Sequence, residues 1–582
     1  MLVALLSIFF AGTGVLGTIG WSAYQSGTFA LDESLAKALV AGLPFALFCA
    51  IACFFALLTV FSRLKYRSEL RIENPDSAST DENERKHAAA RKGIAFFTGS
   101  WSVRCVARTA LLVLVCWIPY LVLYAPGVLT FDPLWSIMQC FGSGALPMIT
   151  PLDGGGAFSA HKPLVHTWIL GGFLLAGNAF GSQTIGLFLY VLLQCVCMAA
   201  SLAAACCYLA KLGVSWRVRC GALVFCAAFP FIPLYAVNCF NDVMFSWIYL
   251  LFLIATIEVV RTRSTVLHRV GFTATYAFLG VALACTKNPG IYLVLITVAI
   301  EALVYRRNLI RFAIPFFTPL LISAFVLPMF VYPAADVVSG SSSEALGPLY
   351  QSTAAYANRY PQEITDDERS AINAVLEYDA LSSTYDPVTQ DPVKTLQRTE
   401  ATGEDKLRYF AAWVHMGMKH PEIYLVSIGL VPMPFCCPSA EFTYYDNSAP
   451  TTIDYYLEGF DSPSPQLAQA MAHLDVNENP AFDEARTTLR TALSTVGSIP
   501  VLGWPLGLGF WASWVPLFCV VGICVSRRRW TPTLVPTFLS VALLALSPWA
   551  MARYALPLVL SAPLLIGVLY ARIEPYPPSA TN

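Results

Sequence analysis

Charged residues are scarce in this sequence: Asp, Glu, Lys and Arg make up 13% of its 582 residues, whereas hydrophobic residues make up 56%. A water-soluble protein of this length does not need many apolar runs of about 20 residues, the length that spans the hydrocarbon core of a bilayer. The formal net charge is only −1, so nothing in the total charge suggests a nucleic-acid partner. The composition therefore predicts an all-α polytopic membrane protein.

Three further features are absent. The first segment, "MLVALLSIFFAGTGVLGTIGW", lacks the basic start and the clear cleavage site of a secretory signal, so we expect it to be a retained membrane helix. The 17 cysteines include no C-x-x-C pair at metal-ligand spacing, and most of them lie inside apolar runs as small hydrophobic residues. The sequence also has no repeat of fixed period and no inverted halves, which many secondary transporters have.

Basic residues concentrate in certain connections between the apolar runs, and such connections are expected on the cytoplasmic side. They are residues 62–104, then Lys211, Arg217 and Arg219, Arg261, Arg263 and Arg269, Arg306, Arg307 and Arg311, Arg527 to Arg529, and Arg572. All of these can lie on one side only if residues 164–181 do not cross the membrane. We therefore predict an interfacial helix there, about twelve transmembrane helices, and both termini in the cytoplasm.

This topology divides the chain into five parts. They are two N-terminal transmembrane helices (1–62), a cytoplasmic basic loop (63–104), a transmembrane core with an outer loop at 126–182 (105–331), an extracytoplasmic domain (332–503), and three C-terminal transmembrane helices with a short cytoplasmic tail (504–582). The segment 332–503 has 23 Asp and Glu against 9 Lys and Arg, so its net charge is −14. Thr365 and Glu368 form a capping-box pattern in it, and "DKLRYFAAWVHMGMKHP" predicts a helix that ends before Pro421.

Polar residues gather at the predicted outer ends of the membrane helices. They are Asp132 in "YAPGVLTFDPLWSIMQ", His161, Lys162 and His166 in "HKPLVH", Asn241 and Asp242 in "FND", Lys287 and Asn288 in "CTKNPG", and Arg553 and Tyr554 in "MARYALP". Each has an ordinary structural explanation: Asp132, Asn241, Asp242 and Asn288 suit helix N-caps, and Lys287 and Arg553 could reach toward the headgroups. The five-residue spacing of the two histidines supports a metal pair only weakly.

Taken together, these residues favour a chemical role. Lys162, Lys287 and Arg553 break the charge bias of the membrane on the same face as Asp132. A carboxylate there can deprotonate an acceptor hydroxyl as it attacks a sugar's anomeric carbon. Lys or Arg can hold the leaving phosphate of a lipid-linked donor and stabilise its developing charge.

The same stretches resemble a known superfamily. PG(x)3-FD(x)6-Q at 126–139, HKP(x)2-H at 161–166, the ND at 241–242, KNPGIY at 287–292 and RYALP at 553–557 are similar to the GT-C superfamily of membrane glycosyltransferases. The resemblance covers roughly residues 105–571. It is closest to a branch of uncharacterised multispanning proteins from Gram-positive bacteria, through "LYQSTAAYANRYPQEITDDE", "YDALSSTYDP" and "QDPVK".

The resemblance implies a GT-C-like helical bundle with interfacial helices and a largely α-helical extracytoplasmic domain, in the cell membrane of a bacterium. It implies a polyprenyl-phosphate sugar donor, an envelope glycan, glycolipid or protein acceptor, and an active site that faces outside among membrane lipids. Asp132 would be the catalytic acidic residue and Asp242 the second acidic position. His161, Lys162, His166, Asn241, Lys287, Asn288, Arg553 and Tyr554 would bind substrate.

Two departures from the superfamily pattern leave points open. Only one aspartate follows "TF", where many members have two acidic residues, and His161-Lys162-Pro163 stands where paired His or Pro is common. The sequence therefore assigns no certain cofactor and leaves a divalent metal and the donor sugar open. A lipid or polysaccharide transporter (flippase) and a non-catalytic envelope assembly scaffold are the alternatives.

Overall fold

The computed structural model describes residues 1–25, 33–73, 88–140, 158–338, 343–439, 474–476, 479–573 and 575. Within these ranges the chain is almost entirely helical, and its one sheet pairs β1 (Phe158–Ser159) in parallel with β2 (Val337–Val338). Parts of the predicted basic loop (74–87), of the outer loop (141–157) and of the acidic domain (339–342, 440–473 and 477–478) lie outside the described residues.

The N-terminal region contains two long helices. α1 (Leu2–Ala11), the π-helical η1 (Gly12–Leu16) and α2 (Gly17–Gln25) follow one another without a break, and α3 runs over Glu33–Glu73. α3 therefore continues beyond residue 62, where the sequence predicted the end of the second membrane helix. α5 (Ala88–Thr98) then leads to the main bundle.

The main bundle is built from two stretches of the chain. The first comprises α6 (Val103–Leu123), α7 (Phe131–Cys140), α8 (Leu164–Ala179), α9 (Gln183–Lys211), α10 (Trp216–Ala228), α11 (Phe231–Ala236), α12 (Asn241–Arg261), η2 (Thr265–His268), α13 (Val270–Thr286), α14 (Gly290–Val304), η3 (Arg306–Phe312), α15 (Ala313–Leu321), η4 (Ile322–Val331) and α16 (Tyr332–Ala334). The second comprises η10 (Phe510–Trp514), α26 (Val515–Ser526), η11 (Arg528–Leu534), α27 (Val535–Ala545), η12 (Ala552–Ala555) and α28 (Leu556–Leu569).

In the part of the chain that the structure describes, seven helices are long and apolar enough to cross a membrane, which agrees with the predicted all-α membrane protein. They cover Leu2–Ser22, Ser34–Tyr66, Val103–Leu123, Gln183–Lys211, Asn241–Arg261, Arg306–Ala334 and Ala552–Leu569. Five further apolar helices of 10–17 residues lie within the described ranges, and Leu164–Ala179 and Pro421–Leu430 are two of them. The total of twelve spans therefore stays a prediction. α12 and α28 are almost wholly buried at the centre of the bundle, whereas peripheral helices expose large apolar side chains such as Phe48 and Phe330.

A second, smaller core lies at one end of the molecule. It is formed by α17 (Ser343–Arg359), η5 (Pro361–Glu363), α18 (Asp366–Asn373), α19 (Tyr378–Thr384), α20 (Asp391–Lys394), α21 (Gly403–Lys419) and α22 (Pro421–Leu430). The predicted capping box of Thr365 and Glu368 is present, and Thr402 and Asp405 form another at the start of α21. α21 ends at Lys419, so the predicted helix before Pro421 is confirmed.

The chain after α22 returns to the main bundle. It contains η6 (Met433–Phe435), η8 (Pro480–Phe482), α25 (Asp483–Gly497) and η9 (Trp504–Leu506). Phe435, Cys437, Leu474 and Val476 pack into the core of the main bundle. The described part of 332–503 is therefore divided between the small domain and the bundle, because only its first half has a separate core.

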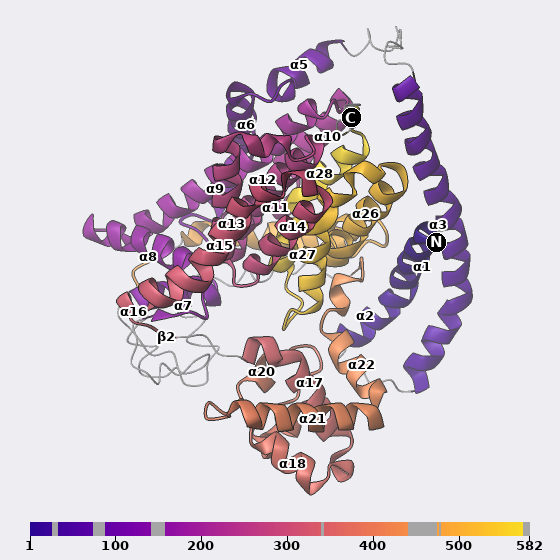
Figure 1. Cartoon of the computed structure of the whole chain (residues 1–582), viewed down its shortest axis with the longest axis vertical. Helices are drawn as coiled ribbons and strands as arrows, with labels where there is room; N and C mark the ends of the chain where they lie inside the picture. Colours follow the sequence, from indigo (N-terminus) through magenta and orange to yellow (C-terminus); the bar gives the residue numbers. More distant parts are fainter. Residues whose placement is uncertain are drawn as a thin grey trace.

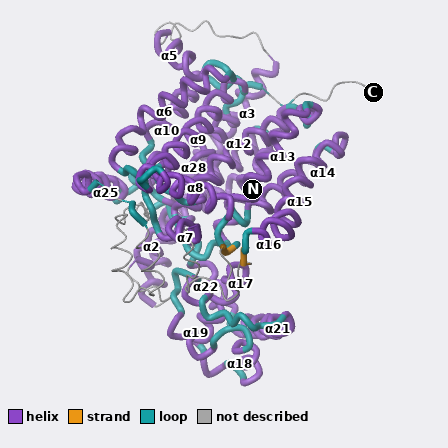
Figure 2. The backbone as a smooth tube through the Cα atoms, turned by 90° about the vertical axis from the view of Figure 1, so that its left-hand side faces the viewer, coloured by secondary structure: helices purple, strands orange, loops and turns teal. Residues whose placement is uncertain are grey.

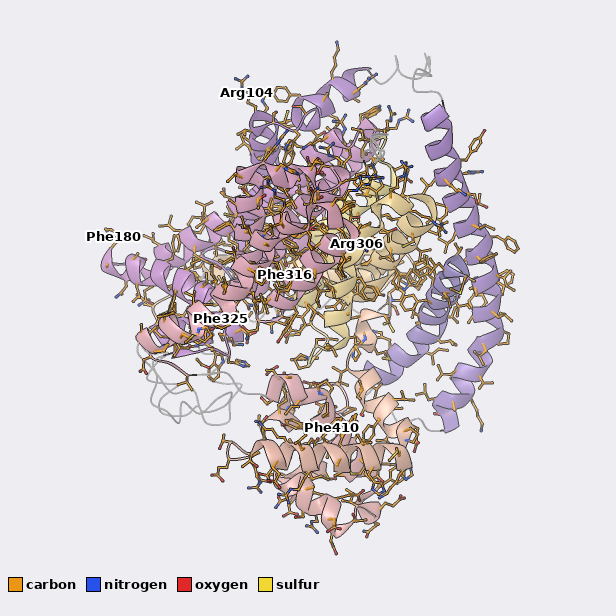
Figure 3. All side chains as sticks on the ribbon, viewed as in Figure 1. Arg104, Phe180, Arg306, Phe316, Phe325 and Phe410 are labelled. Atoms are coloured by element: carbon orange, nitrogen blue, oxygen red, sulfur yellow. The ribbon has the colours of Figure 1, made fainter. Side chains whose placement is uncertain are left out.

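The molecule has two distinct ends. α5 and the last turns of α3 lie at one end and the small domain of α17–α21 lies at the other (Figure 1). The sticks in Figure 3 show Arg104 at the first end and Phe410 in the small domain at the second. α7 and β2 lie on the side of the bundle that faces the small domain, as both ribbon views show (Figures 1 and 2).

α8 and α9 form a tight helical hairpin. Gly177 and Gly186 face each other across it, and a Cβ at Gly177 would come within 2.7 Å of the Cα of Gly186. Phe180, at the turn, is 91% exposed and marks the outer tip of the hairpin in Figure 3. α8 has 16 residues and is therefore about 24 Å long, less than the roughly 30 Å of a hydrocarbon core.

Candidate functional site

The segment that carries Asp132 is fixed by backbone pairing. α6 ends at Leu123, and Gly127 has a φ of +141°, a conformation that residues other than glycine rarely adopt. Val128 then pairs with the 237–239 segment: its N–H donates to the carbonyl of Val237 (3.0 Å), and its carbonyl accepts from Cys239 (3.1 Å). This pairing places Asp132 close to the start of α12, which carries Asp242.

Asp132 is not the N-cap of a helix. α7 begins at Phe131, so Asp132 lies in the first turn, and its carboxylate is turned toward two cations. Its Oδ1 accepts a hydrogen bond from Lys162 Nζ at 2.6 Å, and its Oδ2 lies 2.7 Å from Arg553 Nη1. The capping explanation is therefore wrong for this residue.

Five charged side chains form one continuous chain of ion pairs. It runs from Lys162 through Asp132, Arg553 and Asp242 to Lys287, since Arg553 Nε lies 3.6 Å from Asp242 Oδ2 and Lys287 pairs with Asp242 Oδ1. We call these five residues the charge chain. Arg553 and Asp242 are its most buried members, with side chains 8% and 5% exposed. Two carboxylates and three cations give the charge chain a net charge of +1.

Aromatic rings cover the cations. The guanidinium of Arg553 lies 4.2 Å from the ring centre of Phe240 and 5.2 Å from that of Tyr554. Lys287 Nζ lies 4.6 Å from the ring centre of Tyr554. Such contacts stabilise a cation by about 0.5–2 kcal/mol, more when the site is dry. Lys287 and Arg553 therefore point into the protein. The alternative explanation, in which both side chains reach toward lipid headgroups, is wrong.

The protonation states follow from these contacts. Burial alone would raise the pKa of Asp132, but the charges of Arg553 and Lys162 outweigh it and hold that pKa well below its usual range. Burial, assisted by the charge of Lys162, lowers the pKa of His161 to about 4. At neutral pH Asp132 is therefore an ionised but weak base, and His161 is neutral.

Two of the remaining predicted residues, Asn241 and Asn288, brace the backbone next to the charge chain. Asn241 Nδ2 donates to the carbonyl of Thr286 (3.1 Å), immediately before Lys287, and Asn288 Nδ2 donates to the carbonyl of His161 (3.5 Å). His166 is buried, and its Nε2 lies 3.0 Å from Tyr190 Oη. The described residues contain no group of three or more His, Cys, Asp or Glu side chains that could hold a metal ion.

One polar network of the structure was not predicted from the sequence. The hydroxyl of Tyr190 donates to Gln194 Oε1 (3.0 Å), and Gln194 Nε2 donates to the carbonyls of Ala236 (2.9 Å) and Asn238 (2.7 Å). It anchors α9 to the turn that leads into α12. A glutamine inside the apolar run "LFLYVLLQCVCM" was the available signal, because polar residues inside membrane helices usually have a specific partner.

One family model matches most of the chain. Neither the search of curated proteins nor the search of solved structures found a match. Residues 149–573 match DUF6020, described as a family of unknown function. This segment is more than half of the 582 residues, and the chain therefore belongs to that family.

Proposed function

We propose that the protein is a membrane glycosyltransferase of the GT-C type, which moves a sugar from a polyprenyl-phosphate donor to an envelope acceptor at the outer face of the cell membrane. The observation that carries this proposal is the charge chain, in which two carboxylates and three cations are joined by contacts of 3.6 Å or less. Four of its members lie within the family match, and Asp132 lies before it.

The net charge of the charge chain supports an anionic ligand. A buried charge without a counter-charge is costly, and here three cations share two carboxylates. A phosphate group would supply the missing negative charge and could accept hydrogen bonds from Arg553, Lys162 or Lys287. The polyprenyl tail of such a donor would remain in the bilayer while its phosphate lies at the headgroup level.

The same contacts suggest how Asp132 would become a base. In the charge chain Asp132 is stabilised by Lys162 and Arg553, and this makes its carboxylate a weak base. A donor phosphate that binds either cation would weaken that stabilisation and raise the basicity of Asp132. Asp132 would then take the proton of the acceptor hydroxyl as its oxygen bonds to the anomeric carbon. The bond from that carbon to the phosphate oxygen breaks, and the polyprenyl phosphate leaves with the electron pair.

Asp242 has a different part in this proposal. Its carboxylate holds Lys287 and lies 3.6 Å from Arg553, so it fixes both cations where the phosphate would bind. Asn241 and Asn288 would hold the backbone around them, and Tyr554 would keep water from Lys287 through its ring. His161, neutral and beside Lys162, would offer a hydrogen bond to the sugar or the acceptor.

The orientation belongs to the same proposal. The small domain would lie outside the cell, and the end with α5 would lie in the cytoplasm (Figure 1). Both termini would also be cytoplasmic, as the distribution of basic residues predicts. α8, which is shorter than the hydrocarbon core of a bilayer, would lie at the outer interface, and twelve helices would cross the membrane.

Ligand binding and turnover test this proposal separately. A short-chain polyprenyl phosphate should stabilise the purified protein, by about 2.7 kcal/mol at a concentration one hundred times its Kd, whereas the corresponding polyprenol should not. Lys287→Gln should weaken the effect. Asp132→Asn should keep the binding but lower the envelope glycan made in a deletion strain roughly 100-fold. Full complementation by Asp132→Asn would instead support the non-catalytic scaffold.

One observation favours transport as a second candidate. Glu301 is fully buried in the bundle, Tyr276 donates to its Oε2 (2.9 Å), and its Oε1 has no hydrogen-bond partner among the described residues. An ionisable residue inside a membrane bundle is a common feature of transporters. Loss of lipid translocation in Glu301→Gln, measured in proteoliposomes with a fluorescent lipid and with Asp132→Asn still active, would favour transport over transfer.

A further inference from the structure

α21 carries apolar residues on two opposite faces. Tyr409, Ala412 and Met416 face the core of the small domain and are buried. On the opposite face, Leu407 is 71% exposed, Phe410 49%, Val414 37% and Met418 70%. An exposed apolar stripe of this length on a small domain indicates an interaction site, because monomeric surfaces rarely leave such a stripe uncovered.

The spacing of the stripe is that of a coiled-coil seam. Leu407, Ala411, Val414 and Met418 are separated by four, three and four residues, and all four are exposed. This is the alternation of a and d positions over two heptads, which a facing helix fills by knobs-into-holes packing. The stripe therefore fits another helix with the same spacing.

The edge of the stripe is held rigid. Phe410 stacks on Trp413 with ring centres 5.7 Å apart, and the Nε1 of Trp413 donates to Ser352 Oγ at 2.7 Å. An aromatic residue fixed in advance loses little conformational entropy when a partner covers it, and such residues dominate the binding energy of interfaces.

We infer that the occupant of this stripe is the α21 stripe of a second copy of this chain, packed antiparallel. α21 crosses the long axis of the molecule, along which α3 runs, and lies at the edge of the small domain (Figures 1 and 2). Two copies in one membrane share an orientation, so the two-fold axis between them runs along the membrane normal. That axis brings the two α21 helices together at one height and in opposite directions.

The sequence of the stripe is compatible with this symmetry. An antiparallel pair centred between Ala412 and Trp413 places Leu407 opposite the partner's Met418 and Phe410 close to the partner's Val414. It also brings Glu404, in the first turn of α21, close to the partner's Lys419 in its last turn, which in its own domain pairs with Glu368 at 3.1 Å. Opposite charges thus meet at both ends, and the antiparallel helix dipoles attract each other.

The size of the contact indicates a weak dimer that depends on the membrane. One helix pair of this length buries less than the 1,200–2,000 Å² or so of a standard stable interface. Confinement of both copies to one bilayer in one orientation raises their effective concentration and offsets that deficit. We therefore expect the dimer in membranes and its loss when the protein is diluted in detergent.

Site-specific photo-crosslinking in native membranes tests this inference. With p-benzoylphenylalanine in place of Phe410, irradiation should give an adduct of two chains, shown by two differently tagged copies and mapped by mass spectrometry to residues 407–418 of the second copy. The same amino acid in place of Glu377, an exposed residue beside α19, is the matched control and should give about tenfold less of this adduct.

A seam variant completes the test. Val414→Asp should lower the adduct from position 410 about tenfold, because it places a charge in the seam without touching the domain's core, whereas Glu377→Lys should not change it. Three results would each overturn the inference. The first is a yield of the two-chain adduct from position 410 that equals the yield from position 377. The others are an adduct with another protein or with lipid, and an adduct that Val414→Asp leaves unchanged. None of these results depends on whether the protein transfers sugar.

Discussion

Arg553 joins the two halves of the charge chain, and its removal should have a large effect on stability. Its side chain is 8% exposed, pairs with Asp132 at 2.7 Å and lies 3.6 Å from Asp242. Removal of one partner from a buried ion pair costs about 3–5 kcal/mol. Because Asp132 keeps Lys162 and Asp242 keeps Lys287, we expect Arg553→Gln to cost about 3 kcal/mol, at the low end of that range.

The protein's own cysteines provide the assay. Many of them, including Cys195, Cys207 and Cys519, are buried, so a thiol-reactive dye reports their exposure as the protein unfolds on heating. Arg553→Gln should lower the midpoint by about 2–3 °C, because an unfolding entropy of about 2.1 cal/mol/K per residue makes the shift per kcal/mol small in a chain of this length. Arg408→Gln is the matched control: Arg408 is 63% exposed and pairs with Asp405 on the surface, so its loss should shift the midpoint by less than about 1 °C.

A double-variant cycle identifies the cause of the loss. Once Asp132 is replaced by Asn, removal of Arg553 leaves one fewer uncompensated charge, so the double variant should be more stable than the sum of the single effects by on the order of 1–3 kcal/mol. Strict additivity, or a shift for Arg553→Gln no larger than that for Arg408→Gln, would refute the ion-pair reasoning and with it the basis for an anion site.

Two further predictions concern parts of the fold away from the charge chain. Gly186→Val should force α8 away from α9, because a Cβ at Gly186 would collide with the carbonyl of Phe173. The yield of monodisperse protein in size-exclusion chromatography should therefore fall. Gly172→Val is the control and should leave the yield unchanged, because Gly172 has open space around it. Burial tends to raise the pKa of Glu368, but hydrogen bonds from Thr365, His415 and Lys419 outweigh this and lower it to about 2. A lowered carboxyl pKa stabilises the fold above the unfolded value of about 4.3 and loses that effect as pH falls toward 2. The difference in thermal midpoint between the wild type and Glu368→Gln should therefore shrink over this window, and a difference that is constant with pH would contradict the assignment.

The sequence predicted the class of the fold because its main signals are local. Apolar length identifies a membrane helix, and the Thr365–Glu368 capping box depends on residues three positions apart. The division of the segment 332–503 was missed because it depends on packing between distant parts of the chain. Phe435 and Leu474 look no different in sequence from core residues of the small domain, yet they pack into the main bundle.

The candidate site was predicted as a set of residues but not as a set of contacts. Charges at the ends of apolar runs stand out because an unpaired charge there is costly, so Asp132, Lys162, Asp242, Lys287 and Arg553 could all be selected without a structure. The sequence could not give their pairing, because Asp132 meets a cation 30 positions away and another near the end of the chain. The pairing is decided by the backbone bridge between Val128 and Asn238 and by the glutamine of α9 that holds the same turn.

This pairing gives the two aspartates, which the resemblance names as the catalytic acidic residue and the second acidic position, different surroundings. Asp242 is 5% exposed and lies at the start of a helix that is buried along most of its length, so its carboxylate has little room for anything but its two cations. Asp132 is 18% exposed and lies on a short helix that follows a loop on the side of the bundle facing the small domain. Under the proposed function we expect a ligand to approach Asp132 rather than Asp242, because Asp132 is more exposed and its cation Lys162 pairs with no other member of the charge chain. The proposed function therefore assigns the chemistry to Asp132 and the positioning of the cations to Asp242.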